Sequence, residues 1–137
     1  MNIVDYPKLF DAAREDPEGL GIEVSYQAAT AFLVGCNAGN SGHLLDGFRE
    51  WLSMKLGYVS EGAWPELVLR IAFTFPEDGR VSISERLDPD PDADAAARAK
   101  LFELIGDFWE IRGPRGLPDI FYDYQSFLAR QPGQQVP

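Results

Sequence analysis

The stretch LFELIGDFWEI, residues 101–111, decides the fold of this chain, because its apolar residues recur at the spacing of an α-helix. They are Leu101, Leu104, Ile105, Phe108 and Ile111, flanked by Phe102 and Trp109. We therefore expect a helix over residues 95–111 that buries this stripe against other helices. The preceding segment DPDPDAD, residues 88–94, contains two prolines, so we expect it to stay outside the helix while its aspartates complement the helix dipole.

Four other segments carry helical periodicity, and each has a start signal. Asp5, Ser25 and Ser41 are residues that cap helix N-termini, and Pro118 suits a first helical position after a turn at residues 113–116. We expect these helices to end near Pro17, Asn37, Gly57 and Arg130, in that order. Their apolar faces would pack together in a compact bundle.

The segment 64–87 supports two interpretations. Pro65 at a first helical position favours a helix through Phe73. Alternation with period two from residue 67, followed by the turn sequence PEDG and then VSIS, favours a short β-hairpin within 67–87 instead. The sequence thus predicts a mainly α fold, a compact bundle of about five to six amphipathic helices, with the hairpin left open.

Length and composition indicate one globular domain over residues 1–130 and a disordered tail over 131–137. A chain of 137 residues, 45% of them hydrophobic, can bury a sizeable core without metal or disulfide staples. The one cysteine, Cys36, excludes an internal disulfide, and we expect a reducing cytoplasm. The longest apolar run, residues 67–75, is too short to span a bilayer, so no membrane association is expected.

The charge balance favours a basic protein as partner. The formal net charge is -10, from 22 acidic and 12 basic residues. Such a field repels phosphate backbones and anionic lipid surfaces, so neither nucleic acid nor membrane is expected as a ligand. A positively charged protein surface would be attracted instead.

Residues with catalytic or ligand-binding chemistry are few, and we expect no enzyme activity and no cofactor or metal. His43 is the only histidine, so a nucleophilic pair would need it beside Cys36, and one Cys with one His cannot supply a zinc site. The glycines at 35, 39 and 42 lack the strand-to-helix setting of a phosphate loop. The aspartates of 88–94 resemble half of a calcium loop, but its glycine and glutamate positions are alanines.

Two acidic groups are the candidate partner-binding residues. One is the aspartate-rich segment before the helix at 95–111, and the other is a set of carboxylates on that helix at i, i+4 and i+7, which share a face. The alternative for both is a solvated surface that only caps or covers the helix. The candidates are Asp88, Asp90, Asp92, Asp94, Glu103, Asp107 and Glu110.

Three runs, FLVG at 32–35, LLDGFREWL at 44–52 and WPELVL at 64–69, resemble small acidic bacterial proteins encoded as immunity partners beside polymorphic toxins. The shared residues are mostly core aromatics and leucines, so they bear on the fold more than on the role. The resemblance implies a cytoplasmic protein that binds the toxin domain of its own system and blocks its active site or substrate access. Tyr58, Trp64, Tyr122 and Tyr124 are candidate aromatic anchors for such an interface.

Two other classes stay open on the sequence. A regulatory or structural adaptor would present an exposed apolar groove on a homodimer instead of an acidic patch. A carboxylate-dependent enzyme would hold two Asp or Glu residues in a concave pocket. The sequence leaves the oligomeric state open.

Overall fold

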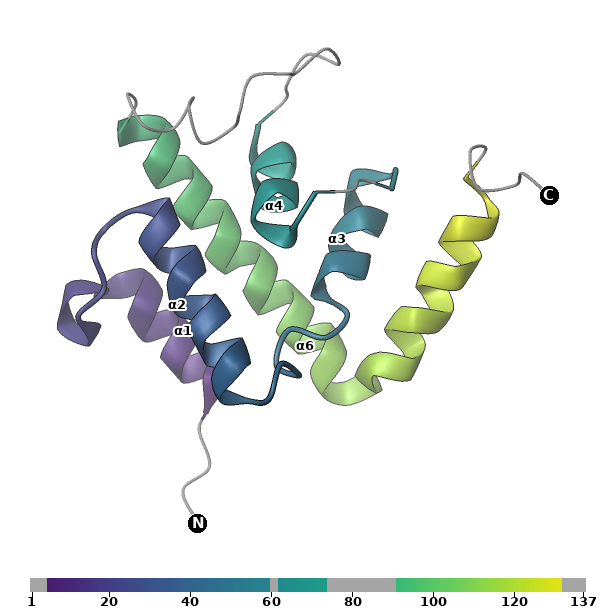
Figure 1. Cartoon of the computed structure of the whole chain (residues 1–137), viewed down its shortest axis with the longest axis horizontal. Coiled ribbons are helices and arrows are strands. Elements are labelled where there is room, and N and C mark those ends of the chain that lie inside the picture. The colour runs from purple at the N-terminus through teal and green to yellow at the C-terminus, as the bar shows by residue number, and fades with distance from the viewer. Residues whose placement is uncertain (1–4, 60–61, 74–90, 132–137) are drawn as a thin grey trace.

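The computed structural model describes residues 5–59, 62–73 and 91–131, and this part of the chain is mainly helical. Figure 1 shows the arrangement of the helices. The elements are α1 (Tyr6–Glu15), the short 3-10 helix η1 (Glu18–Leu20), α2 (Tyr26–Gly39), α3 (Phe48–Leu56), α4 (Trp64–Ala72) and α6 (Pro91–Ala129). The mainly α prediction is confirmed.

Helix α6 is the centre of the fold. Its first half runs between two pairs of helices, with α1 and α2 on one side and α3 and α4 on the other (Figure 1). All four helices pack against α6, and α3 also packs against α4. The stripe predicted over residues 101–111 therefore has neighbours on two sides of its helix.

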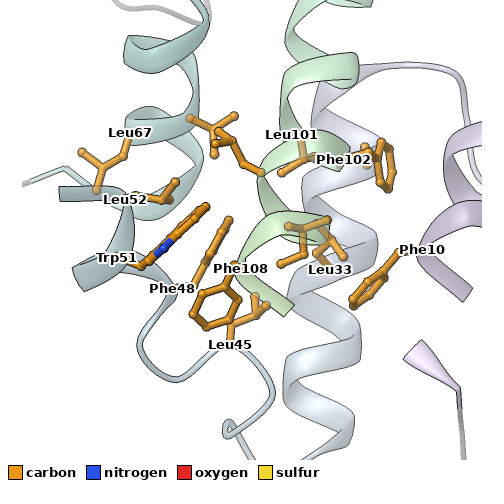
Figure 2. Close-up of a cluster of buried hydrophobic side chains, with 14 of the residues drawn as sticks. Phe10, Leu33, Leu45, Phe48, Trp51, Leu52, Leu67, Leu101, Phe102 and Phe108 are labelled. Carbon is orange, nitrogen blue, oxygen red and sulfur yellow. The ribbon is translucent and has the colours of Figure 1, made fainter. Parts of the chain in front are cut away.

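The core is built around two phenylalanines that face each other from α3 and α6. Phe48 and Phe108 are fully buried, and their ring centroids lie 5.1 Å apart. Trp51 contacts both rings, at 6.2 Å from Phe48 and 5.7 Å from Phe108. Figure 2 shows these side chains on one side of α6 and Phe10 and Phe102 on the other. Aromatic pairs at these separations add to the stability gained by burial.

Local start and stop signals are confirmed at three helix ends. The carboxylate of Asp5 accepts a hydrogen bond from the backbone N–H of Lys8, and the Ser25 hydroxyl accepts one from Ala28. Each bond satisfies an N–H that the first turn of a helix leaves unpaired. Gly57 ends α3 in the left-handed conformation, with φ of 85°, as glycine at a helix C-terminus does.

The predicted helix start at Ser41 is wrong. Residues 41–47 form a chain of turns, and α3 begins only at Phe48. Within these turns Ser41, Gly42 and Gly47 all have positive φ, which a right-handed helix does not tolerate. Partners outside the segment hold it: the Asn37 side chain accepts a hydrogen bond from the Leu45 N–H, and Arg112 on α6 donates to the carbonyls of Leu44 and His43.

The start of the long helix is also corrected. Pro91, Asp92 and Asp94 belong to the first turn of α6, whereas the sequence placed them before it. Proline is tolerated at a first helical position because its missing N–H would have no partner there, and aspartate suits the positive end of the dipole. Farther along the chain, α6 has a kink at Gly116, where φ is 78° and ψ is 175°. This is the turn predicted at 113–116, after which the chain changes direction (Figure 1).

The helical interpretation of residues 64–72 is confirmed, since α4 spans them and its Leu67 and Val68 are fully buried. The first strand of the alternative hairpin would have used these same residues. Its turn and second strand fall in 74–90, outside the described residues, and so does the predicted tail beyond residue 131.

Candidate functional site

A groove with a volume of about 740 Å³ lies between α1 and α6. It lies on the side of α6 that faces away from α3 and α4. On α1 its lining residues are Pro7, Phe10, Asp11 and Arg14, and on α6 they are Ala99, Phe102, Glu103, Gly106, Asp107, Trp109 and Glu110.

The floor of the groove is aromatic. The rings of Phe10 and Trp109 meet edge to face, with centroids 5.9 Å apart and planes at 88°. Tyr6 contacts both, at 5.9 Å from Phe10 and 5.8 Å from Trp109. The Asn40 amide donates a hydrogen bond to the Tyr6 hydroxyl at 2.5 Å, which ties this cluster to the end of α2. These rings are held in place before any ligand arrives, a condition for binding without a large entropic cost.

The rim of the groove is acidic. Glu103, Asp107 and Glu110 line it from α6, and Asp11 lines it from α1. Two cations lie nearby: Lys100 forms an ion pair with Glu103 at 2.9 Å, and Arg14 lies 3.6 Å from Asp11. The side chains of Glu103 and Asp11 keep 58% and 68% of their surface exposed. Exposed pairs of this kind contribute little to stability, so the carboxylates stay open to other cations.

A smaller pocket of about 140 Å³ continues the groove toward the start of α2. It shares Arg14, Ala99 and Phe102 with the groove, and it adds residues of the segment between η1 and α2, among them Ile22 and Val24. Val24 is 44% exposed. The concave surface between α1 and α6 thus extends along most of the first half of α6.

The structure brings Glu103, Asp107 and Glu110 together as the sequence predicted, and adds Asp11. Sequence reasoning missed Asp11, which lies on the polar face of α1 with no signal that this face would meet α6. It also treated Phe102 and Trp109 as flanks of the buried stripe, although both line the groove. Only the packing of α1 on α6 puts these residues around one concavity.

The aspartate-rich segment is placed elsewhere. Asp94 lies in the first turn of α6, where its carboxylate accepts hydrogen bonds from the Tyr26 N–H and from Arg98 Nε, both at 2.9 Å. Asp92 lies in the same turn and is exposed. Asp88 and Asp90 are outside the described residues. Neither Asp92 nor Asp94 lines the groove.

Cys36 and His43 lie in different surroundings. Cys36 is half-buried on α2 against the core, and burial raises the pKa of its thiol. The His43 ring is mostly exposed, and its Nδ1 lies 3.0 Å from an oxygen of Asp46. Gly35 and Gly39 belong to α2 and Gly42 to the turn after it, so these glycines do not lie between a strand and a helix.

The four candidate anchors differ in exposure. Tyr122 on the second half of α6 is 73% exposed, and its neighbour Phe121 is 40% exposed. Tyr58, just after α3, is 43% exposed. Trp64 is partly buried against the core, and Tyr124 is half-buried with its ring 6.1 Å from that of Phe127. None of the four lines the groove between α1 and α6.

Two searches of the described ranges gave negative results. No group of three His, Cys, Asp or Glu side chains among residues 5–59, 62–73 and 91–131 could hold a metal ion. In the same ranges no helix combines the length and the apolar character needed to cross a bilayer.

Comparison with known proteins leaves the chain without an assigned family. No family model matches it, and searches of curated proteins and of solved structures give no significant match. Its function must therefore be argued from its own residues.

Proposed function

We propose that this chain is a non-catalytic binding protein that docks a basic protein partner through the groove between α1 and α6. The observation that carries the proposal is the lining of the groove, where four carboxylates stand beside one guanidinium around an aromatic floor. A field of this sign attracts Lys and Arg side chains and speeds their encounter with the surface. Aromatic side chains near the middle of such a surface are the usual energetic anchors of an interface.

The class of partner comes from the resemblance in residues 32–35, 44–52 and 64–69. We infer an immunity protein that binds the toxin domain of its own bacterial system and prevents access to the toxin's active site. Both proteins would meet in the cytoplasm. A stable complex needs roughly 800 Å² of buried surface on each partner, which the groove and its rim supply only together with neighbouring surface on α1 and α6.

The exposure of the carboxylates favours docking over catalysis. Acid and base catalysts are usually sequestered from water, where their charge state can be tuned and the reaction protected. Glu103 and Asp11 are more than half exposed, and Asp107 and Glu110 are exposed as well. An exposed row of like charges at helical spacing is mildly unfavourable in the free protein, and a partner's cations would relieve it.

Neutralisation of a toxin by charge-reversal variants tests the proposal. The proposal expects a toxin domain in the reading frame beside this chain, and the test co-expresses that domain with the wild type or with a double variant, Asp107→Lys with Glu110→Lys. We expect the double variant to lose protection of the host cells. Its association rate with the purified toxin domain should fall at least about tenfold, because the steering charge is reversed.

A matched control carries the same change in net charge away from the groove. Glu18 on η1 and Asp123 on the second half of α6 are both exposed, so Glu18→Lys with Asp123→Lys serves this purpose. We expect this control to protect the cells as the wild type does. Raising the ionic strength from about 0.05 M to about 0.5 M should slow association of the wild type. Equal protection by both double variants, together with association that ignores salt, would reject the proposal.

A self-associating adaptor is the second candidate, and the pair Phe121 and Tyr122 favours it. These adjacent aromatic residues are exposed on the second half of α6, on a different part of the surface from the groove. Exposed apolar patches often mark interfaces. Mass measurement of the purified chain by light scattering decides this: a dimer that dissociates on substitution of both residues by serine supports the adaptor, and a monomer rejects it.

A further inference from the structure

We propose that the groove receives an amphipathic, positively charged segment of the partner, with a large apolar side chain seated over Gly106. This inference rests on the proposed function and specifies the chemistry of the partner at the same site. Gly106 lies in the middle of α6, on the lining of the groove. Glycine is less stable than alanine inside a helix, so its presence at position 106 calls for a physical explanation.

Packing within the protein does not explain why residue 106 is a glycine. A Cβ at Gly106 would have no neighbouring atom within 4 Å apart from the helix backbone and the adjacent residues. Its φ is in the ordinary range, unlike those of Gly47, Gly57 and Gly116. Neither a close helix contact nor a special backbone conformation requires glycine here. The consequence of the missing side chain is a notch in the floor of the groove.

Aromatic side chains stand on both sides of this notch. Phe102 precedes Gly106 by four residues and Trp109 follows it by three, so all three lie on one face of the helix. Phe10 closes the floor from α1, with its ring 5.9 Å from that of Trp109. A Leu, Met or Phe side chain of the partner would sit on the backbone at Gly106 and against the exposed part of Trp109, while Phe10 and Phe102 are mostly buried in the core and line the base of the groove. Burial of one such side chain removes apolar surface from water and so favours association.

The carboxylates around the notch indicate which residues should flank the partner's apolar side chain. Glu103, Asp107 and Glu110 follow the groove along α6, and Asp11 faces it from α1. Lys or Arg residues on both sides of the apolar anchor would therefore meet carboxylates on both helices. The lining from Ala99 to Glu110 extends about 16 Å along α6 at 1.5 Å per residue, which a helical segment of about eleven residues would match.

Peptide selection tests the inference without knowledge of the partner. The probe is a display library of random peptides about 16 residues long, enough for a helix that spans the groove, selected on the full chain. We expect the enriched peptides to combine one or two large apolar residues with flanking Lys or Arg. Their affinity should fall at least about tenfold for Gly106→Leu, in which the new side chain fills the notch. Asp107→Lys with Glu110→Lys should weaken them as well.

Ala96→Leu is the matched control, since Ala96 is exposed on the same helix but does not line either pocket. Circular dichroism should show that Gly106→Leu folds at least as stably as the wild type, because leucine is the better helix former. Gly106→Ala serves as a second variant with a smaller side chain and a smaller loss. Enriched peptides that lack basic residues, no enrichment at all, or equal affinity for wild type and Gly106→Leu would overturn the inference. If only Gly106→Leu behaves as wild type while charge reversal still abolishes toxin neutralisation, the proposed function stands and this inference fails.

Discussion

The carboxylate of Asp94 accepts a hydrogen bond from the backbone N–H of Tyr26 at 2.9 Å, although the two residues are 68 positions apart in the chain. Tyr26 is the first residue of α2, so its N–H has no partner within its own helix. The hydroxyl of the same tyrosine donates to the carbonyl of Pro65 at 2.5 Å. One residue thus joins the beginnings of α2, α4 and α6, and burial raises its pKa so that it stays protonated.

Replacement of Asp94 by alanine is expected to reduce the free energy of unfolding by about 1–2 kcal/mol, the usual effect of removing a helix cap that is also hydrogen-bonded to an arginine. Urea denaturation of the variant and the wild type measures this difference in the free energy of unfolding. Asp107→Ala is the control, because this exposed carboxylate of the groove should change stability by less than about 0.5 kcal/mol. Equal unfolding midpoints for the two variants would contradict the role given to Asp94. The same role makes Asp94 a poor site for testing partner binding by charge reversal.

Alanine substitution is expected to reduce the free energy of unfolding more at Gly47 than at Gly57. Both residues have φ near 85°, so each substitution forces alanine into the left-handed region at about 1 kcal/mol or more. At Gly57 nothing else is close, whereas a Cβ at Gly47 would lie 2.9 Å from a methyl carbon of Leu117. Gly47→Ala should therefore cost at least about 1 kcal/mol more than Gly57→Ala in thermal or urea unfolding. An equal cost would mean that Leu117 moves aside freely.

Arg112 is expected to hold the turns before α3. Its guanidinium donates to the carbonyls of Leu44 at 2.6 Å and His43 at 3.1 Å, and it stacks over Trp109 at 4.9 Å. Arg112→Lys keeps the charge but loses the planar, two-point geometry, so it should not restore what Arg112→Ala loses. Amide exchange at Leu45 reports on the turns, and we expect faster exchange in both variants. Unchanged exchange would show that the Asn37 contact suffices alone.

Cys36 is expected to react slowly with alkylating reagents in the folded protein. Burial raises the pKa of its thiol, so at a pH near the ordinary thiol value less of it is the reactive thiolate. The rate should rise with pH along a curve displaced to higher pH relative to the chain unfolded in urea, which is the reference. A folded-state curve at the same or lower pH than the unfolded one would contradict this.

Helix starts and ends were predictable where local chemistry decides them. Asp5 accepts a hydrogen bond from Lys8, and Ser25 accepts one from Ala28. The two partners of each bond are only three residues apart, so the local sequence is enough to predict it. The turns after α2 were not predictable, because Arg112 holds them from about 70 residues away. Ser41 has the composition of a helix cap, but its positive φ belongs to a tertiary arrangement that overrides local preference.

Only part of the candidate site could be predicted from the sequence, because the rest depends on how the helices pack together. Helical spacing alone puts Glu103, Asp107 and Glu110 on one face, but it cannot say whether that face is convex surface or one wall of a groove. The answer depends on where α1 packs, and with it on Asp11 and Phe10. Gly106 carried a signal in the sequence, since a glycine inside a strong helical pattern costs stability, yet its meaning appears only once its surroundings are known.

The central position of α6 has a consequence for how the protein is made. Helices α1 to α4 are synthesised before α6, and yet each of them packs against it. Until residues 91–111 emerge, Phe48 has no Phe108 to face and Phe10 has no contact with Trp109. The nascent chain therefore cannot complete its core before α6 emerges, and the apolar surfaces that α6 covers stay exposed to water until then.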